Sequence, residues 1–173
     1  MTPLDSDPDF DAHEKELRRG YVRAPSHLRL QALREWESEG EDGNQIRAYL
    51  RLAMKVSATE ALARSLVLDA VLLAEELGPW EAYSRYKIQG NGKKSTIRSA
   101  NAATLVDYLI QELRMEPAEQ ILGENVWKRF CFAQRYRNLI LHEGTFLRGG
   151  YAEILMNATE EVYGQLVEIA ERR

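Results

Sequence analysis

Residues 61–77, ALARSLVLDAVLLAEEL, form the most apolar run of the chain. Charged side chains interrupt it only at Arg64, Asp69, Glu75 and Glu76. A helix that is apolar almost all round is typical of the centre of a helical protein. The run is too short and too charged to span a bilayer. We therefore expect a central, buried helix here.

The flanking sequence continues this helical pattern on both sides. Apolar residues recur at helical spacing from Asn44 to Val56. The sequence Ser57-Ala-Thr-Glu60 fits a capping box, which predicts that a helix begins or kinks there. Gly78-Pro79 is expected to end the central helix, and a short helix is expected over residues 80–87.

The rest of the chain also favours helices, because strand-like alternation is scarce. We expect a loop at 89–94 and helices at 95 or 99 to 114, 117–122, 124–141 and 151–171, separated by glycines. These predict an all-α fold, an antiparallel bundle of four to five core helices with a short N-terminal helical appendage. Residues 1–43 would be that acidic, partly disordered appendage, and residues 44–173 the bundle.

Composition and charge narrow the class of protein. The chain has 173 residues, a net charge of −4 and one cysteine, Cys131, so an intrachain disulfide is excluded. The first residues lack the apolar segment of a secretory signal, and we expect a cytoplasmic protein without a membrane segment. Residues 85–98 carry five basic and no acidic side chains, and residues 127–148 carry five basic and one acidic. These two segments are either a groove for a phosphate chain or ordinary solvated faces.

The helix expected over residues 124–141 contains an arginine where its apolar pattern calls for a core residue. At about 100° per residue, Arg137 falls between Val126 and Phe130, on the side that also carries Ala133 and Ile140. A guanidinium in an apolar setting is unfavourable unless it is paired or faces water. Such broken patterns tend to mark functional or strained sites.

A carboxamide and an imidazole follow this arginine. Asn138 is four residues before His142, so the two share one face of a continuous helix. An imidazole titrates near neutral pH and can exchange protons with a ribose hydroxyl or a leaving oxygen. Arginine can clamp a phosphate, and asparagine can orient the histidine or hold a phosphate oxygen. The three groups suit RNA cleavage that needs no metal or other cofactor.

The sequence Arg137-Asn-Leu-Ile-Leu-His142 resembles the R-x4-6-H motif of the HEPN superfamily, in its R-N-x-x-x-H form. The resemblance covers residues 44–171. It implies a four- or five-helix bundle, a homodimer with the motif at its interface, and metal-independent endoribonuclease activity. Arg137 and His142 would be the catalytic pair, supported by Asn138. Many such proteins are toxins or effectors in bacterial toxin–antitoxin or antiviral defence, which implies an antitoxin or regulatory protein as a partner.

One position departs from the family pattern. HEPN toxins paired with a nucleotidyltransferase antitoxin usually carry a tyrosine two places after the histidine, where this chain has Gly144. Lesser candidates for RNA contact are Glu124 and four basic residues: Lys128, Arg129, Lys93 and Lys94.

Less specific interpretations stay open for each of these residues. His142 would then be a helix-end imidazole that interacts with terminal carbonyls. Arg137 would be a snorkelling side chain or a member of a buried ion pair with a carboxylate of another helix. The alternative function is a non-catalytic HEPN-like module that binds RNA, a nucleotide or a protein. A purely structural helical oligomer would require that Arg137 be neutralised internally.

Overall fold

A computed structural model confirms the expected all-α class. It describes Lys15, residues 44–143 and residues 151–172, without the side chains of 44–46, 142 and 143. Its elements are α3 (Asn44–Ala74), α4 (Pro79–Arg85), β1 (Lys87–Gly90), β2 (Lys93–Thr96), α5 (Ala102–Arg114), α6 (Ala118–Leu122), α7 (Glu124–Glu143) and α8 (Tyr151–Glu171). Apart from Lys15, the expected appendage of residues 1–43 lies outside the described residues.

Helix α3 runs without a break through the sequence that resembles a capping box. Ser57 Oγ donates a hydrogen bond to the carbonyl of Ala53 at 2.9 Å, and Thr59 Oγ1 donates to that of Lys55 at 2.8 Å. A cap needs backbone N–H groups without a helical partner, which exist only in the first turn of a helix. Because the preceding residues are already helical, these hydroxyls bond backwards instead. The predicted helix start at Ser57 is therefore wrong.

The second half of α3 is less deeply buried than its apolar sequence predicts. Ala63, Val67 and Val71 are fully buried or nearly so, whereas Leu73 is 83% exposed. The helix ends at Ala74, and Pro79 stands at the first position of α4, where its missing N–H is tolerated. Only the side of α3 that meets other helices is covered.

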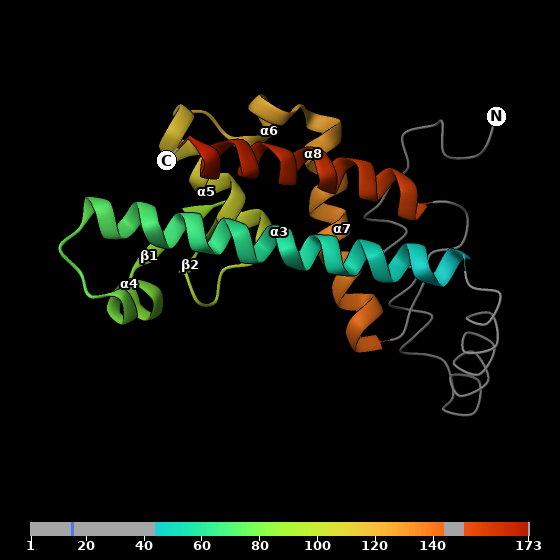
Figure 1. The fold of residues 1–173 in the computed structure, drawn as a ribbon, viewed down its shortest axis with the longest axis horizontal. Helices are drawn as coiled ribbons and strands as arrows, with labels where there is room; N and C mark the ends of the chain where they lie inside the picture. Colours follow the sequence, from blue (N-terminus) through green and yellow to red (C-terminus); the bar gives the residue numbers. More distant parts are fainter. Residues whose placement is uncertain (1–14, 16–43, 144–150, 173) are drawn as a thin grey trace.

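The helices are arranged differently from a simple antiparallel bundle. Helices α3 and α8 lie side by side and run in the same direction, and α7 crosses both at a steep angle (Figure 1). Short connections force antiparallel packing only on consecutive helices. Helices α3 and α8 are separated by four helices and a hairpin, so no short connection sets their relative direction.

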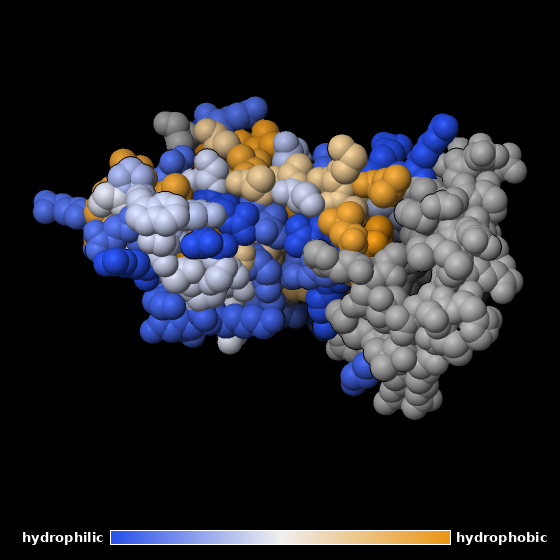
Figure 2. Space-filling view, turned by 90° about the horizontal axis from the view of Figure 1, so that it is seen from below, coloured by the Kyte–Doolittle hydropathy of each residue, from blue (hydrophilic) through white to orange (hydrophobic). Residues whose placement is uncertain are grey.

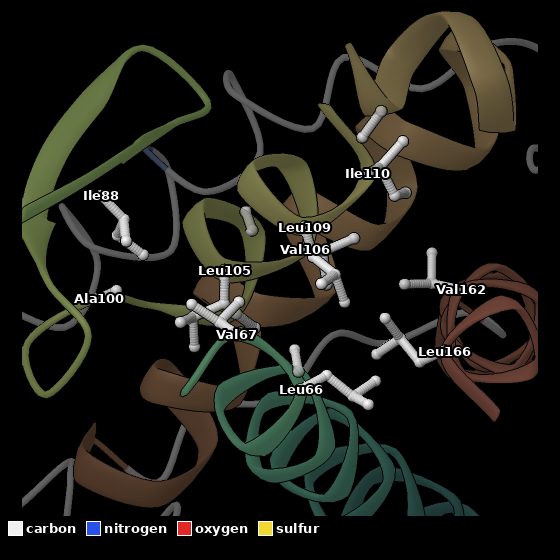
Figure 3. Close-up of a cluster of buried hydrophobic side chains, with 14 of the residues drawn as sticks. Leu66, Val67, Ile88, Ala100, Leu105, Val106, Leu109, Ile110, Val162 and Leu166 are labelled. Atoms are coloured by element: carbon white, nitrogen blue, oxygen red, sulfur yellow. The ribbon is translucent and has the colours of Figure 1, made fainter. Parts of the chain in front are cut away.

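Two clusters of buried apolar side chains hold these helices together. The larger lies where α5 packs against α3 and α8, with Leu105 of α5 close to Val67 of α3, and with Leu166 beside them on α8 (Figure 3). The smaller joins the first half of α3, the second half of α7 and the start of α8; its buried members are Tyr49, Leu52, Ala53, Val56, Phe132, Ala133, Tyr136, Leu139, Ile140, Ala152 and Leu155. Helix α7 contributes to both clusters, because Trp127 and Phe130 in its first half belong to the larger one.

The segment predicted to be a loop at 89–94 is a β-hairpin. Strands β1 and β2 are antiparallel, and Gly90 pairs with Lys93, which leaves a two-residue turn. Asn91 and Gly92 occupy that turn with φ of 48° and 67°. Asn-Gly strongly favours such turns because both residues tolerate positive φ. The hairpin also delays the next helix, which starts at Ala102 with the Asn101 side chain as its cap rather than at Ser95 or Ser99.

The hairpin docks closely on α5. A Cβ atom on Gly90 would lie 2.3 Å from the backbone oxygen of Thr104 and 2.8 Å from the backbone nitrogen of Tyr108. The buried carboxylate of Asp107 accepts hydrogen bonds from the backbone N–H of Asn91 and, at 2.7 Å, from that of Ala118. One side chain of α5 thus ties the hairpin turn to the start of α6, which leads directly into α7.

Most of the surface seen in Figure 2 is polar, with smaller apolar patches. Large apolar side chains that are exposed include Leu50 and Met54 on α3 and Leu141 on α7. None of the helices in the described residues is long and apolar enough to cross a membrane.

Two glycine substitutions test the docking of the hairpin. Gly90→Ala is expected to lower the free energy of unfolding by about 1–3 kcal/mol, because backbone atoms of α5 cannot yield to the added methyl group. Gly164→Ala is the control, since nothing lies within 4 Å of its added Cβ in α8. It should raise stability by about 0.5–1 kcal/mol. Urea unfolding of both variants measures this, and equal effects would contradict the close approach.

Candidate functional site

Arg137 projects from α7 to α3, where a carboxylate meets it. Its Nη2 atom lies 3.2 Å from Oε2 of Glu60, and the two side chains are 17% and 15% exposed. The arginine that broke the apolar pattern of α7 is therefore neutralised by a carboxylate of another helix. A buried ion pair of this kind is what a structural role for Arg137 requires.

Two neighbouring polar side chains complete the surroundings of Arg137. Its Nε and Nη2 atoms both donate to Oδ1 of Asn138, at 3.3 and 3.1 Å. Its Nη1 atom donates to Oγ of Ser57 on α3 at 3.4 Å. Asn138 thus holds the plane of the guanidinium from the same helix, while Ser57 and Glu60 hold it from α3.

Glu60 is shared with a second arginine. Arg64, one turn further along α3, places Nη2 2.7 Å from Oε1 of Glu60. The same Nη2 atom donates to the carbonyl of Ala100 at 2.9 Å, and Nε donates to that of Ile97 at 3.3 Å. Arg64 therefore joins α3 to the segment between the hairpin and α5.

The two arginines differ in the lengths of their contacts. The shortest contacts of Arg64 are 2.7 and 2.9 Å, whereas those of Arg137 range from 3.1 to 3.4 Å. Within the described residues, Oε2 of Glu60 accepts no well-aligned hydrogen bond, although Nη2 of Arg137 lies within ion-pair distance. Shorter charge-assisted bonds are the stronger ones. Arg64 is thus a firmly anchored structural residue, and Arg137 is a loosely held one.

This charged group lies between the two apolar clusters. On α3, Val56 belongs to the smaller cluster and Ala63 to the larger, with Ser57, Glu60 and Arg64 within or just beyond that interval. Sequence reasoning missed the role of Glu60, which was interpreted as a capping residue. The one available signal was the spacing of Glu60 and Arg64, four apart on a helix.

Helix α7 carries the other two motif positions in the expected way. It extends past Asn138 through His142 to Glu143, so positions 138 and 142 lie one turn apart on the same side of the helix. The side chain of His142 lies outside the described part of the chain. Its position in a helix end, predicted from the sequence, is confirmed for the backbone.

The structure does not bring the lesser candidates of α7 to Arg137. Lys128 forms an exposed ion pair with Glu124, with Nζ 3.3 Å from Oε1. Lys128 precedes Arg137 by nine residues, which is about two and a half helical turns, so it points to the opposite side of the helix. Arg129 is half-buried. Residues 124 and 128 therefore belong to a solvated face rather than to the site of Arg137.

The hairpin lysines lie beside a different part of α7. Lys93 and Lys94 are exposed on β2, and the turn residue Asn91 places its side-chain nitrogen 3.9 Å from Sγ of Cys131. Burial raises the pKa of the Cys131 thiol from its usual 9.0 to about 12; Asp107 and Glu119 also raise it, and Arg135 and Lys93 lower it. Such a thiol is protonated at neutral pH and cannot serve as a nucleophile.

Tyr136, the residue before Arg137, is part of the smaller core. It is completely buried, stacks on Phe132 and meets Tyr49 edge-on, each with ring centroids 5.9 Å apart. Burial raises the pKa of its hydroxyl, so it stays neutral. Its ring has no free face for RNA.

No three histidine, cysteine or acidic side chains come together as metal ligands in the described residues. The chain matches no protein-family model, no curated protein and no solved structure. Its resemblance to HEPN proteins therefore stays a prediction that rests on Arg137, Asn138 and His142. The fold shows which side chains surround Arg137, namely Glu60, Asn138 and Ser57.

Substitution of each arginine by methionine tests the difference in anchoring. Arg64→Met leaves the carbonyls of Ile97 and Ala100 and one oxygen of Glu60 without a donor, which should lower stability by about 2–4 kcal/mol. Arg137→Met leaves Glu60 paired with Arg64 and should lower it by about 1 kcal/mol. Urea unfolding compares the two. A larger loss for Arg137→Met would contradict the assignment of Arg64 as the anchor.

The raised pKa of Cys131 predicts slow alkylation of the folded protein. At pH 8 a thiol with a pKa near 12 is far less ionised than one near 9.0. Iodoacetamide should therefore modify the folded chain at least about a hundredfold more slowly than the urea-unfolded chain. Mass spectrometry of quenched samples follows both reactions. Similar rates in the two states would show that the thiol is accessible.

Proposed function

We propose that this chain is a metal-independent endoribonuclease of HEPN type that acts through Arg137, Asn138 and His142. The observation that carries the proposal is how the Arg137 guanidinium is positioned and which contacts hold it. Its guanidinium is placed by Asn138, Ser57 and Glu60, is 17% exposed, and is held by contacts of 3.1 to 3.4 Å, longer than the two shortest contacts of Arg64. A preorganised but loosely bound guanidinium is well suited to take up a phosphate.

The proposed reaction is an intramolecular transfer at phosphorus. A base removes the proton of a ribose 2′-OH, the 2′-oxygen attacks the adjacent phosphorus, and the bond from phosphorus to the 5′-oxygen breaks. An acid protonates that leaving oxygen, so the products are a 2′,3′-cyclic phosphate and a 5′-hydroxyl. His142 supplies one of these proton transfers, and Arg137 stabilises the charge that grows on the phosphate oxygens.

Each chain contributes one motif histidine, whereas the reaction uses both an acid and a base. A homodimer with the motif at its interface would supply two copies across one groove. This arrangement, and a role as a toxin or effector in bacterial toxin–antitoxin or antiviral defence with an antitoxin or regulatory protein as partner, belong to the proposal through the resemblance to HEPN proteins.

A second candidate function is a non-catalytic module that binds RNA, a nucleotide or a protein. The ion pair between Arg137 and Glu60 favours it, because this contact satisfies the guanidinium without any ligand. The net charge of −4 points the same way, since it disfavours general binding to nucleic acid. The two candidates differ in turnover, which makes them separable by experiment.

RNA cleavage in the presence of EDTA tests the proposal. The wild-type protein should cut RNA and leave cyclic-phosphate ends, and His142→Ala and Arg137→Ala should each lower the rate by at least about a hundredfold. Glu161→Gln on the exposed side of α8 serves as a control for altered charge and should cut at the wild-type rate. Thermal unfolding establishes that each variant is folded.

Saturable RNA binding by the wild type without new RNA ends would favour the non-catalytic module. Full activity in folded His142→Ala and Arg137→Ala would refute the assigned site. Total RNA, tRNA and mRNA are the substrates to use, because the residues at the site do not define a preferred base.

A further inference from the structure

We propose that Glu60 is a displaceable counter-ion of Arg137. In the free protein it positions the Arg137 guanidinium, and when RNA binds a phosphodiester replaces it on Arg137 while Arg64 keeps it neutralised. This inference rests on the proposed function and assigns Glu60 and Arg64 as positioning residues of that site. Neither residue belongs to the R-N-x-x-x-H motif.

The first argument is the charge of the group. Two guanidiniums, those of Arg64 and Arg137, share the single carboxylate of Glu60. The three side chains together therefore carry one net positive charge. A phosphodiester carries one negative charge, so its arrival on Arg137 would balance the group rather than leave a charge in excess.

The second argument is what happens to Glu60 when it is displaced. A largely buried carboxylate that loses its only partner is strongly penalised, because it has neither water nor a counter-charge. Glu60 avoids this because Oε1 keeps its 2.7 Å contact with Arg64. Arg64 is in turn fixed by two backbone carbonyls that no ligand replaces. The exchange thus needs movement of Arg137 alone.

The third argument is the quality of the contact that must break. Glu60 Oε2 lies 3.2 Å from Arg137 without a well-aligned hydrogen bond, and the remaining contacts of Arg137 are made to neutral oxygens at 3.1 to 3.4 Å. A phosphate can offer two oxygens to a guanidinium in the fork geometry that gives the strongest pairs. The phosphate contact would therefore be better than the one it replaces.

The test uses a single-stranded 2′-O-methyl RNA oligonucleotide, which has no free 2′-OH and cannot be cleaved by this reaction. Glu60→Gln removes the competing negative charge, and we expect it to bind this oligonucleotide about three- to tenfold more tightly than the wild type. With cleavable RNA the same variant should show a lower KM and a lower kcat, because Arg137 has lost the partner that positions it. A merely structural Glu60 would not lower KM.

Glu161→Gln is the matched control, because it removes the same charge from an exposed position on α8. Its affinity for the oligonucleotide should stay within about twofold of the wild type, since exposed charges are well screened. An equal gain in affinity in this control would show that net charge alone is responsible and would overturn the inference. Weaker or unchanged binding by Glu60→Gln would overturn it as well.

A measurement on the wild-type protein covers the case in which Glu60→Gln does not fold. The Nε–H signals of Arg64 and Arg137 in ¹⁵N NMR spectra, assigned with Arg137→Lys, can be followed during titration with the oligonucleotide. We expect the Arg137 signal to shift and the Arg64 signal to stay. Equal shifts, or a shift of Arg64 alone, would refute the exchange. No binding by the wild type would overturn the proposed function itself, whereas binding with an unmoved Arg137 signal would overturn only the role of Glu60.

Discussion

Glu60 on α3 is the single carboxylate that Arg64 and Arg137 share, and it lies where α3 meets α7. A guanidinium on the apolar side of α7 requires a counter-charge, and α3 supplies it at the point where the two helices meet. Arg64 extends the same contact to the carbonyls of Ile97 and Ala100. A polar group therefore lies between the two apolar clusters, at the place where the long helix meets α7.

The charged group contains one fixed and one adjustable arginine, because Arg64 and Arg137 have different partners. Arg64 is bound to backbone carbonyls, which are fixed by the fold. Arg137 is bound to three side chains, those of Glu60, Asn138 and Ser57, which can adjust. Rigid support beneath an adjustable cationic group is a common feature of sites that bind anions, since it limits the reorganisation needed on binding.

The hairpin contributes to this arrangement from a distance. Gly90 allows β1 to approach α5, and Asp107 connects the turn of the hairpin with the start of α6. Gly123, with φ of 85°, then leads from α6 into α7. Asp107 and α6 thus connect the hairpin to the start of the helix that carries Arg137.

Local sequence determined a large part of this structure. The helical class, the limits of α6, α7 and α8, the position of His142 in a helix end and the anomaly at Arg137 all follow from periodicity and from glycine and proline positions. The Asn-Gly pair at 91 and 92 also favours a hairpin turn, although the strands beside it are too short to show alternating apolar and polar residues. Each of these features depends on residues that are near one another along the chain.

Only the tertiary structure decided the partner of Arg137 and the common direction of α3 and α8. Ser57 and Arg137 are 80 residues apart in the chain, and no local pattern states that they meet. Glu60 carries the same sequence signal whether it caps a helix, pairs with Arg64 or neutralises Arg137. Which of these occurs depends on where α7 crosses α3, and that crossing is set by how the whole core packs.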